Sequence, residues 1–201
     1  MFNLIRRDVI LQKRQLYFYI PVILFFIIMG SNPALTFLVA SIFIPFNTYA
    51  YDEKAETNIL LNSLPYTRNE IIASRYLGAI VYMVLSIGVT SLAFFVLNKP
   101  FTMTDIAIGS GLFLLFAALT FPLFYILKPG YITSFVLISF IILTAIAGPI
   151  ASFIEEHLGG IIDFLSNLSI PVLYTGATLI VMLAYVISWG VTTTIYQRKA
   201  F

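Results

Sequence analysis

Few side chains in this sequence could catalyse a reaction or bind a metal ion. The chain has no Cys, and its one His, His157, follows the glutamate pair Glu155 and Glu156. The lack of Cys excludes disulfides, thiolate metal sites and cysteine nucleophiles, and a single His cannot form a metal cluster by itself. The phosphate-binding pattern G-x-x-x-x-G-K-[ST] is also absent. We therefore expect no catalytic, cofactor-binding or metal-binding residue in this chain.

The composition indicates a membrane protein. Of 201 residues, 60% are hydrophobic and 10% are charged, whereas a soluble domain carries about 25% charged residues. The apolar segments are continuous, which favours helices over the alternating strands of a membrane barrel. We predict a single all-α transmembrane domain over residues 1–201, with six spans near Leu16–Gly30, Pro33–Tyr51, Ile72–Leu97, Ile106–Leu127, Ile132–Phe153 and Pro171–Tyr196.

The basic residues predict the orientation of the spans. With both termini in the cytoplasm, only Lys99 of the 11 Lys and Arg residues falls outside the cell, as the positive-inside rule requires. The predicted location is a cell membrane that the chain crosses several times. Several tyrosines lie near the expected cytoplasmic ends of spans, where we expect them to mark the membrane border; they are Tyr17, Tyr19, Tyr49, Tyr51, Tyr125, Tyr131 and Tyr196.

Proline residues and the segments outside the spans complete the predicted layout. Pro45, Pro122 and Pro149 lie inside spans, where each is either a hinge or simply tolerated. Residues 1–14 are amphipathic and predict a helix along the cytoplasmic leaflet or a plain positive anchor. Residues 154–170 predict short helices that re-enter the outer interface.

The connection over residues 52–70 has its own helix signals. Glu53 and Glu56 suit a helix N-terminus, and Leu60 and Leu64 are spaced as neighbours on one helical face. Thr67 with Glu70 forms a capping-box pattern immediately before the third span. Because leucines on a cytoplasmic surface indicate a partner, we predict a short amphipathic helix that binds another protein.

The residues of this connection resemble the permease family of type-2 ATP-binding cassette (ABC) exporters. The resemblance rests on the acidic-basic start at 52–54, on the Leu-Leu-x-Ser-Leu-Pro pattern at 60–65, and on the basic-Tyr-Leu triplet at 75–77. Arg68 matches the Arg that follows the proline in the family pattern. The six-span layout with a partly helical outer segment agrees with this family over the whole chain.

The resemblance implies a transport subunit that works with other chains. Two permeases, identical or closely related, would form the pathway, and two separate ATPase subunits would bind ATP and Mg and dock from the cytoplasm. It implies ATPase-coupling positions at Glu53, Glu56, Leu60, Leu61, Leu64 and Arg68. The short chain resembles compact members of the family that export antimicrobial or cytolytic peptides, including the phenol-soluble modulin exporters, which implies a bacterial cell membrane and an amphipathic peptide as cargo. Lipid and small-drug substrates remain open.

Two other functions remain open from the sequence. A membrane scaffold would use the same cytoplasmic leucines to recruit a partner without transport. A channel would act without an ATPase, although no predicted span carries an ionisable residue near its centre. Membrane lipid is a partner under every interpretation, and no feature indicates nucleic acid.

Overall fold

The computed structural model describes residues 16–54, 67–127 and 167–198, together with the single positions 131, 134, 138, 152, 153, 157, 159 and 160. This part of the chain is helical, as predicted. The segment at 1–14, for which the sequence predicts an interfacial helix or a plain anchor, lies outside the described residues, as do most of the predicted fifth span and most of the predicted outer segment at 154–170. The helices are α2 (Leu16–Ile28), α3 (Pro33–Lys54), α5 (Arg68–Val96), α6 (Met103–Ile126) and α9 (Ile170–Arg198).

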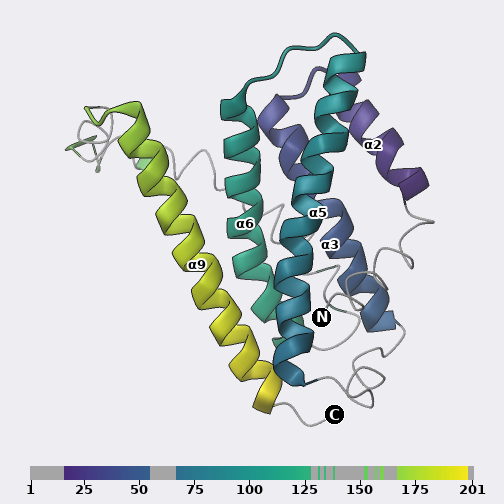
Figure 1. Cartoon of the computed structure of the whole chain (residues 1–201), viewed down its shortest axis with the longest axis vertical. Coiled ribbons are helices and arrows are strands. Elements are labelled where there is room, and N and C mark those ends of the chain that lie inside the picture. Colours follow the sequence, from purple (N-terminus) through teal and green to yellow (C-terminus); the bar gives the residue numbers. More distant parts are fainter. Residues whose placement is uncertain are drawn as a thin grey trace.

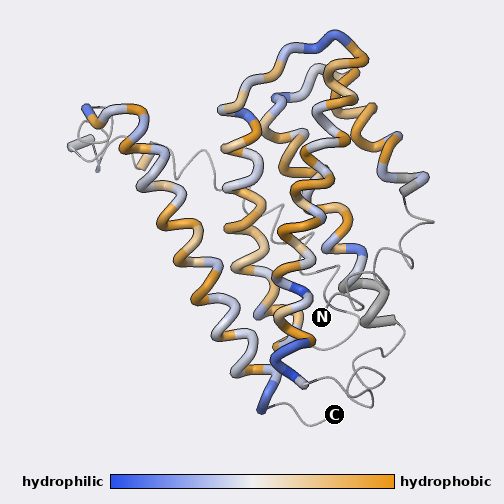
Figure 2. The backbone as a smooth tube through the Cα atoms, viewed as in Figure 1, coloured by the Kyte–Doolittle hydropathy of each residue, from blue (hydrophilic) through white to orange (hydrophobic). Residues whose placement is uncertain are grey.

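Three of the described helices, α5, α6 and α9, are long and apolar enough to cross a membrane. The apolar stretches described in α2 and α3 are shorter and cover Tyr19–Ile28 and Pro33–Thr48. All five helices begin and end within a few residues of the predicted spans. Figure 2 shows hydrophobic residues along the helices and hydrophilic residues gathered at the turn between α5 and α6 and at the far ends of α5 and α9.

The turn between α2 and α3 falls between the first two predicted spans, Leu16–Gly30 and Pro33–Tyr51. Gly30 has a positive φ of 69°, a conformation that glycine adopts without steric cost. The N–H of Ser31 bonds back to the carbonyl of Phe26 at 3.1 Å. The side chain of Asn32 then accepts a hydrogen bond from the N–H of Ala34 at 2.9 Å, so Asn32 caps α3 with Pro33 as its first residue.

The helices run alternately up and down the bundle. Figure 1 shows α6 between α9 and the pair α3 and α5, with α2 beside the upper parts of α3 and α5. α9 packs on α6 and α5, and α3 packs on the same two helices. We call the end of the bundle that carries Arg68 and Arg198 the basic end, and the end that carries the turns at 29–32 and 97–102 the opposite end.

Helix α6 approaches α3 very closely at Gly109. A Cβ atom at this glycine would lie 2.7 Å from the Cβ of Phe37 and 2.8 Å from the backbone oxygen of Ala34. Contacts of this length are shorter than van der Waals distances, so no other residue fits here without moving α3. Gly109 therefore sets the spacing between α3 and α6.

The buried side chains form two clusters. The larger joins α5, α6 and α9 and includes Ile72, Tyr76, Phe121, Tyr125, Tyr185 and Tyr196. The smaller joins α2, α3 and α5 toward the opposite end and includes Tyr19, Ile23, Ile27, Phe37, Ala40 and Phe94.

The expected membrane-border role of the tyrosines is wrong for several of them. Tyr17 and Tyr131 are exposed at 76% and 65%, as border residues should be. Tyr19, Tyr125 and Tyr196 are buried inside the bundle instead, and the last two rings meet edge to face at 5.1 Å. Their hydrophobic area is used in helix packing, which sequence position near a span end does not reveal. Tyr49 and Tyr51 have no described side-chain placement.

Candidate coupling site at the junction of α5 and α9

Two of the predicted coupling residues lie in the described helices. Glu53 is the next-to-last residue of α3, although its side chain is not described, and Arg68 is the first residue of α5. Glu56, Leu60, Leu61 and Leu64 lie at 55–66, outside the described residues. The predicted docking segment therefore connects the ends of α3 and α5, and its docking role stays a prediction.

The start of α5 is fixed by the predicted capping box. The carboxylate of Glu70 accepts hydrogen bonds from the N–H of Thr67 at 2.9 Å and from its hydroxyl at 2.8 Å. In return the Thr67 hydroxyl accepts the N–H of Glu70 at 3.3 Å. The bond from the Thr67 N–H, then that from its hydroxyl, lower the pKa of Glu70, because both stabilise the ionised carboxylate.

Arg68 joins the start of α5 to the end of α9. Its Nη1 donates a hydrogen bond to the carbonyl oxygen of Gln197 at 2.6 Å and a longer one to that of Tyr196 at 3.5 Å. The side-chain amide of Gln197 donates to Asn69 at 2.7 Å. The last carbonyls of a helix lack partners within the helix and carry its negative dipole end, so a guanidinium is well suited to them. We call this contact the α5–α9 clasp.

A second set of polar contacts joins the same helices deeper in the bundle. The Tyr76 hydroxyl lies 2.7 Å from that of Thr192 and 2.8 Å from that of Ser188. The Ser188 hydroxyl donates to the carbonyl of Ala118 in α6 at 2.6 Å. Because each hydroxyl has one hydrogen, this bond makes Tyr76 the donor to Ser188 and leaves Thr192 as the donor to Tyr76. The chain of hydrogen bonds thus links α9, α5 and α6.

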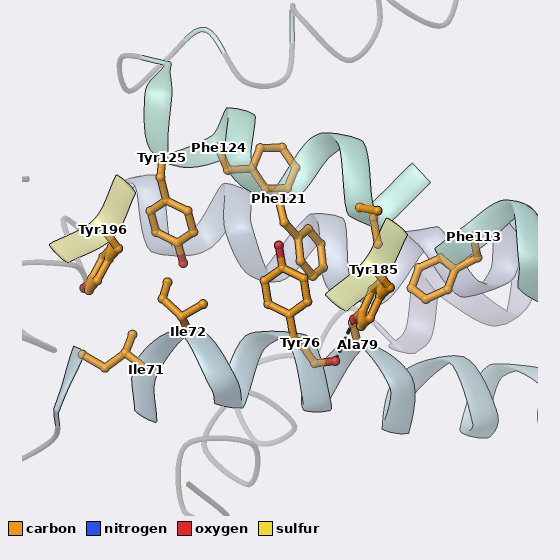
Figure 3. Close-up of a cluster of buried hydrophobic side chains, with 12 residues drawn as sticks. Ile71, Ile72, Tyr76, Ala79, Phe113, Phe121, Phe124, Tyr125, Tyr185 and Tyr196 are labelled. Atoms are coloured by element: carbon orange, nitrogen blue, oxygen red, sulfur yellow. Dashed lines mark hydrogen bonds between the residues drawn. The ribbon is translucent and has the colours of Figure 1, made fainter. Parts of the chain in front are cut away.

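Aromatic packing holds Tyr76 in place. Trp189 stacks on its ring at 5.6 Å with an interplanar angle of 10°, and Phe121 meets it edge to face at 5.0 Å. Figure 3 shows the ring of Tyr76 between α5 and α6, with Tyr185 beside it. The hydroxyl of Tyr185 donates to the backbone carbonyl of Tyr76 at 2.8 Å. Tyr76 is completely buried, so it fixes the relative position of three helices.

The basic-Tyr-Leu triplet therefore has a structural explanation. Arg75 is buried and lines a small pocket between α3 and α5 with Pro45, Thr48 and Tyr82. Tyr76 is the central contact to α9, and Leu77 faces outward. The sequence resemblance identified this triplet, but it did not indicate Asn69, Ser188, Thr192 or Gln197. Ser188, Thr192 and Gln197 lie more than a hundred residues from the α5 residues that they bond to, and all four carry common polar side chains without a local pattern.

The described residues contain no group of three or more His, Cys, Asp or Glu side chains that could hold a metal ion. What the described site offers is mechanical: a capped helix start, a charged clasp to α9 and a buried hydrogen-bonded contact to α6 and α9. These contacts join the start of α5 to α9 and join α5 to α6 through α9.

Comparison with known proteins identifies the family. No curated protein and no solved structure matches the chain. A family model described as an ABC-2 family transporter protein matches residues 3–197, which includes all five described helices except the last residue of α9. Permeases of this family are typically non-catalytic membrane subunits that work with ABC ATPase subunits. The chain belongs to the ABC-2 family and is the membrane component of a transporter.

Proposed function

We propose that the chain is the permease of an ATP-driven exporter and that the segment over residues 52–70 docks a separate ATPase subunit. The family match supports the transporter class. The α5–α9 clasp carries the mechanistic part of the proposal, because it joins the end of the docking segment to a second helix of spanning length. Both ends of the chain and this segment lie in the cytoplasm under the positive-inside rule.

In this mechanism the ATPase moves the docking segment and the bundle follows. When the ATPase subunits close on ATP, the segment 55–66 shifts the start of α5 at Arg68. The clasp and the contacts of Tyr76 keep α9 and α6 in register with α5, so the three helices move together. Because packed helices have discrete arrangements, this motion changes access to the pathway rather than stretching the bundle.

Two copies of the permease would form the pathway, with two ATPase subunits. The proposed cargo is an amphipathic peptide, such as an antimicrobial or cytolytic peptide. Long stretches of α9 expose apolar side chains, among them Leu179, Ile180, Leu183, Val186 and Ile187. Within the described parts of the spanning helices, charged residues stand near the basic end, apart from Asp105 in the first turn of α6. Surfaces of this kind fit lipid and amphipathic chains better than a hydrophilic polysaccharide.

The docking proposal is tested by purification of the tagged chain from its native membrane in mild detergent. We expect stoichiometric recovery of an ABC ATPase with the unchanged chain. Leu60→Asp should abolish that recovery while leaving membrane insertion intact, because it places an unpaired carboxylate in an apolar docking surface. Asn62→Asp is the matched control, since it adds the same charge at a polar position of the same segment. Equal recovery with Leu60→Asp and Asn62→Asp would contradict the docking assignment.

Transport itself needs a reconstituted assay. We expect vesicles that contain the permease and its ATPase to move a fluorescent amphipathic peptide only when ATP is present. A scaffold would move no cargo in this assay, and a channel would move cargo without the ATPase. Either result would contradict the exporter mechanism. Efflux of lipid or small drugs in place of peptide would contradict only the proposed cargo.

A further inference from the structure

Three of the described helices contain an interior proline, namely Pro21 in α2, Pro45 in α3 and Pro122 in α6. Because proline has no N–H, the carbonyl four residues before it loses its helical hydrogen bond, and the helix can bend there. Pro21 stands near the start of α2, so it affects only the first turn of that helix. Pro45 and Pro122 lie deep inside longer helices, and they differ in what replaces the lost bond.

At Pro122 another helix replaces the lost bond. The carbonyl four residues earlier belongs to Ala118, and it accepts the hydroxyl of Ser188 in α9 at 2.6 Å. Ser188 is bonded in turn to the hydroxyl of Tyr76 in α5 at 2.8 Å. A bend at Pro122 would break this bond and leave a backbone carbonyl without a donor inside the bundle, which is costly. Pro122 is therefore held by its neighbours.

The hydrogen bonds of α3 are rearranged over the turn around Pro45. The carbonyl of Ser41 has no helical donor, because the residue four positions later is the proline. The side-chain amide of Asn47 donates to the carbonyl four residues before it at 2.8 Å, and the hydroxyl of Thr48 does the same at 3.0 Å. Such side-chain bonds compete with the helical bonds to the same carbonyls and often bend helices. This turn is therefore less rigid than a regular helical turn.

Two small pockets adjoin Pro45, one toward α5 and one toward α6. Pro45 and Thr48 line the first together with Arg75 of α5. Pro45 and Phe46 line the second together with Phe116 of α6. Protein interiors are otherwise close-packed, and a side chain that borders a void has fewer contacts to lose when it moves. The surroundings of Pro45 therefore offer little resistance to a bend.

The part of α3 before Pro45 is held more tightly than the part after it. The close approach of Gly109 fixes the earlier part against α6 at the Cβ of Phe37. The Phe37 ring also stacks on a ring of α5 at 5.6 Å. After Pro45, the ring of Phe46 meets that of Phe124 in α6 at 6.1 Å in a tilted arrangement. Aromatic pairs keep favourable contacts over a range of separations, so this pair tolerates a small shift.

We propose that Pro45 is a hinge in α3, about which residues 46–54 swing with the docking segment while residues 33–44 stay packed on α6. The hinge rests on the proposed function, because an ATPase bound to the docking segment supplies the motion. The docking segment is continuous with both α3 and α5. Since the α5–α9 clasp ties the start of α5 to α9, the bend is taken up in α3. Residues 46–54 extend about 14 Å as a helix, so a proline bend of about 20° moves Lys54 by about 5 Å.

The test is pulsed electron paramagnetic resonance, which measures the distance between two spin labels. The chain has no Cys, so labels attach only at introduced cysteines. The hinge pair is Lys54→Cys with Leu119→Cys, and the reference pair is Leu35→Cys with Leu119→Cys; Leu35 and Leu119 are exposed. For the permease alone in nanodiscs, we expect a broad distance distribution for the hinge pair and a narrow one for the reference pair. Equally narrow distributions would overturn the hinge.

Two proline variants separate a hinge from fraying at the end of α3. Pro45→Ala supplies the N–H that the Ser41 carbonyl lacks, so the distribution of the hinge pair should narrow. Pro122→Ala is the matched control, because it also removes an interior proline but the carbonyl concerned is already bonded to Ser188; the width should not change. A hinge pair that stays as broad in Pro45→Ala reports fraying and rules the hinge out. The reference pair should keep its distance in both variants, which verifies that they are folded.

Addition of the ATPase separates the hinge from the proposed function. With the ATPase and a non-hydrolysable ATP analogue bound, the hinge-pair distance should shift by about 5 Å while the reference-pair distance stays constant. If both pairs shift equally, α3 moves as one body and the hinge is wrong. If the hinge pair is broad, narrows in Pro45→Ala and ignores the ATPase, the hinge stands and the docking mechanism is contradicted instead.

Discussion

Arg68 and Gln197 are joined by a hydrogen bond of 2.6 Å from the guanidinium Nη1 to the backbone carbonyl. The bond connects the first residue of α5 to the last turn of α9, across 129 positions of sequence. Arg68 thus has a structural partner within the chain, in addition to the docking role predicted for it. The two roles are compatible, because a residue that joins two helices beside a docking segment can transmit motion between them.

Replacement of Arg68 tests whether the clasp transmits motion. We expect Arg68→Met to reduce ATP-driven transport strongly while the ATPase still co-purifies, because α9 no longer follows α5. Gln197→Ala should have the smaller effect, since it keeps the backbone carbonyl that Arg68 binds and removes only the bond to Asn69. The measurement is peptide transport per ATP hydrolysed in vesicles. Loss of ATPase binding in Arg68→Met would instead favour a direct docking role.

Tyr76→Phe tests the buried hydrogen bonds between α5 and α9. The change removes the hydroxyl that accepts from Thr192 and donates to Ser188, and it leaves the stacked rings in place. Interhelical hydrogen bonds in membrane proteins contribute on average about 0.6 kcal/mol, so we expect the free energy of unfolding to fall by about 1 kcal/mol. Equilibrium unfolding in mixed micelles measures it. Tyr17→Phe, at an exposed position, should change it very little, and equal losses from both variants would argue against the network.

Gly109→Ala tests the close approach of α6 to α3. The new methyl group would lie 2.7 Å from the Cβ of Phe37, so we expect a loss of about 1–3 kcal/mol from overpacking. Gly111→Ala is the matched control two residues away, because a Cβ there meets nothing within 4 Å. That control should be neutral or should stabilise α6 by roughly 0.5–1 kcal/mol, as alanine replaces glycine in a helix. Thermal unfolding of both variants in detergent distinguishes these outcomes, and a Gly109→Ala protein as stable as the original would show that α3 is not held at this distance.

The capping box predicts a pH dependence at the start of α5. The pKa of Glu70 is lowered in the folded chain by the N–H and hydroxyl of Thr67. A lowered folded pKa means that the stabilisation is present above the pKa of the unfolded carboxyl, about 4.3, and is lost as the pH falls through the lower folded value. We expect hydrogen-exchange protection of the first amides of α5 to decrease over that acidic range.

Glu70→Gln is the control for the pH prediction. Glutamine keeps an acceptor for the Thr67 N–H but does not titrate, so protection factors of the first turn should become independent of pH between about 6 and 3. A pH dependence that survives in Glu70→Gln would assign the effect to another group.

Local pattern was enough to determine the helices and several of their ends. Long continuous apolar segments dictate helices in a membrane, because lipid offers no partner for backbone groups. The turn at Gly30 and Asn32 and the capping box of Thr67 and Glu70 also depend on local sequence, because their hydrogen bonds join residues two to five positions apart. The family resemblance also came from a short local segment. The family match over residues 3–197 confirms the family itself.

The tertiary structure decided which side chains meet. Sequence spacing shows which face of a helix a residue occupies, but it does not show which helix will cover that face. The partners of Arg68 and Tyr76 therefore could not be predicted. The burial of Tyr19 could not be predicted either, because its position near the end of a predicted span indicated a border residue. Packing of α2, α3, α5, α6 and α9 against one another determined these contacts, because each depends on two helices whose distance is set by side-chain volume, as at Gly109.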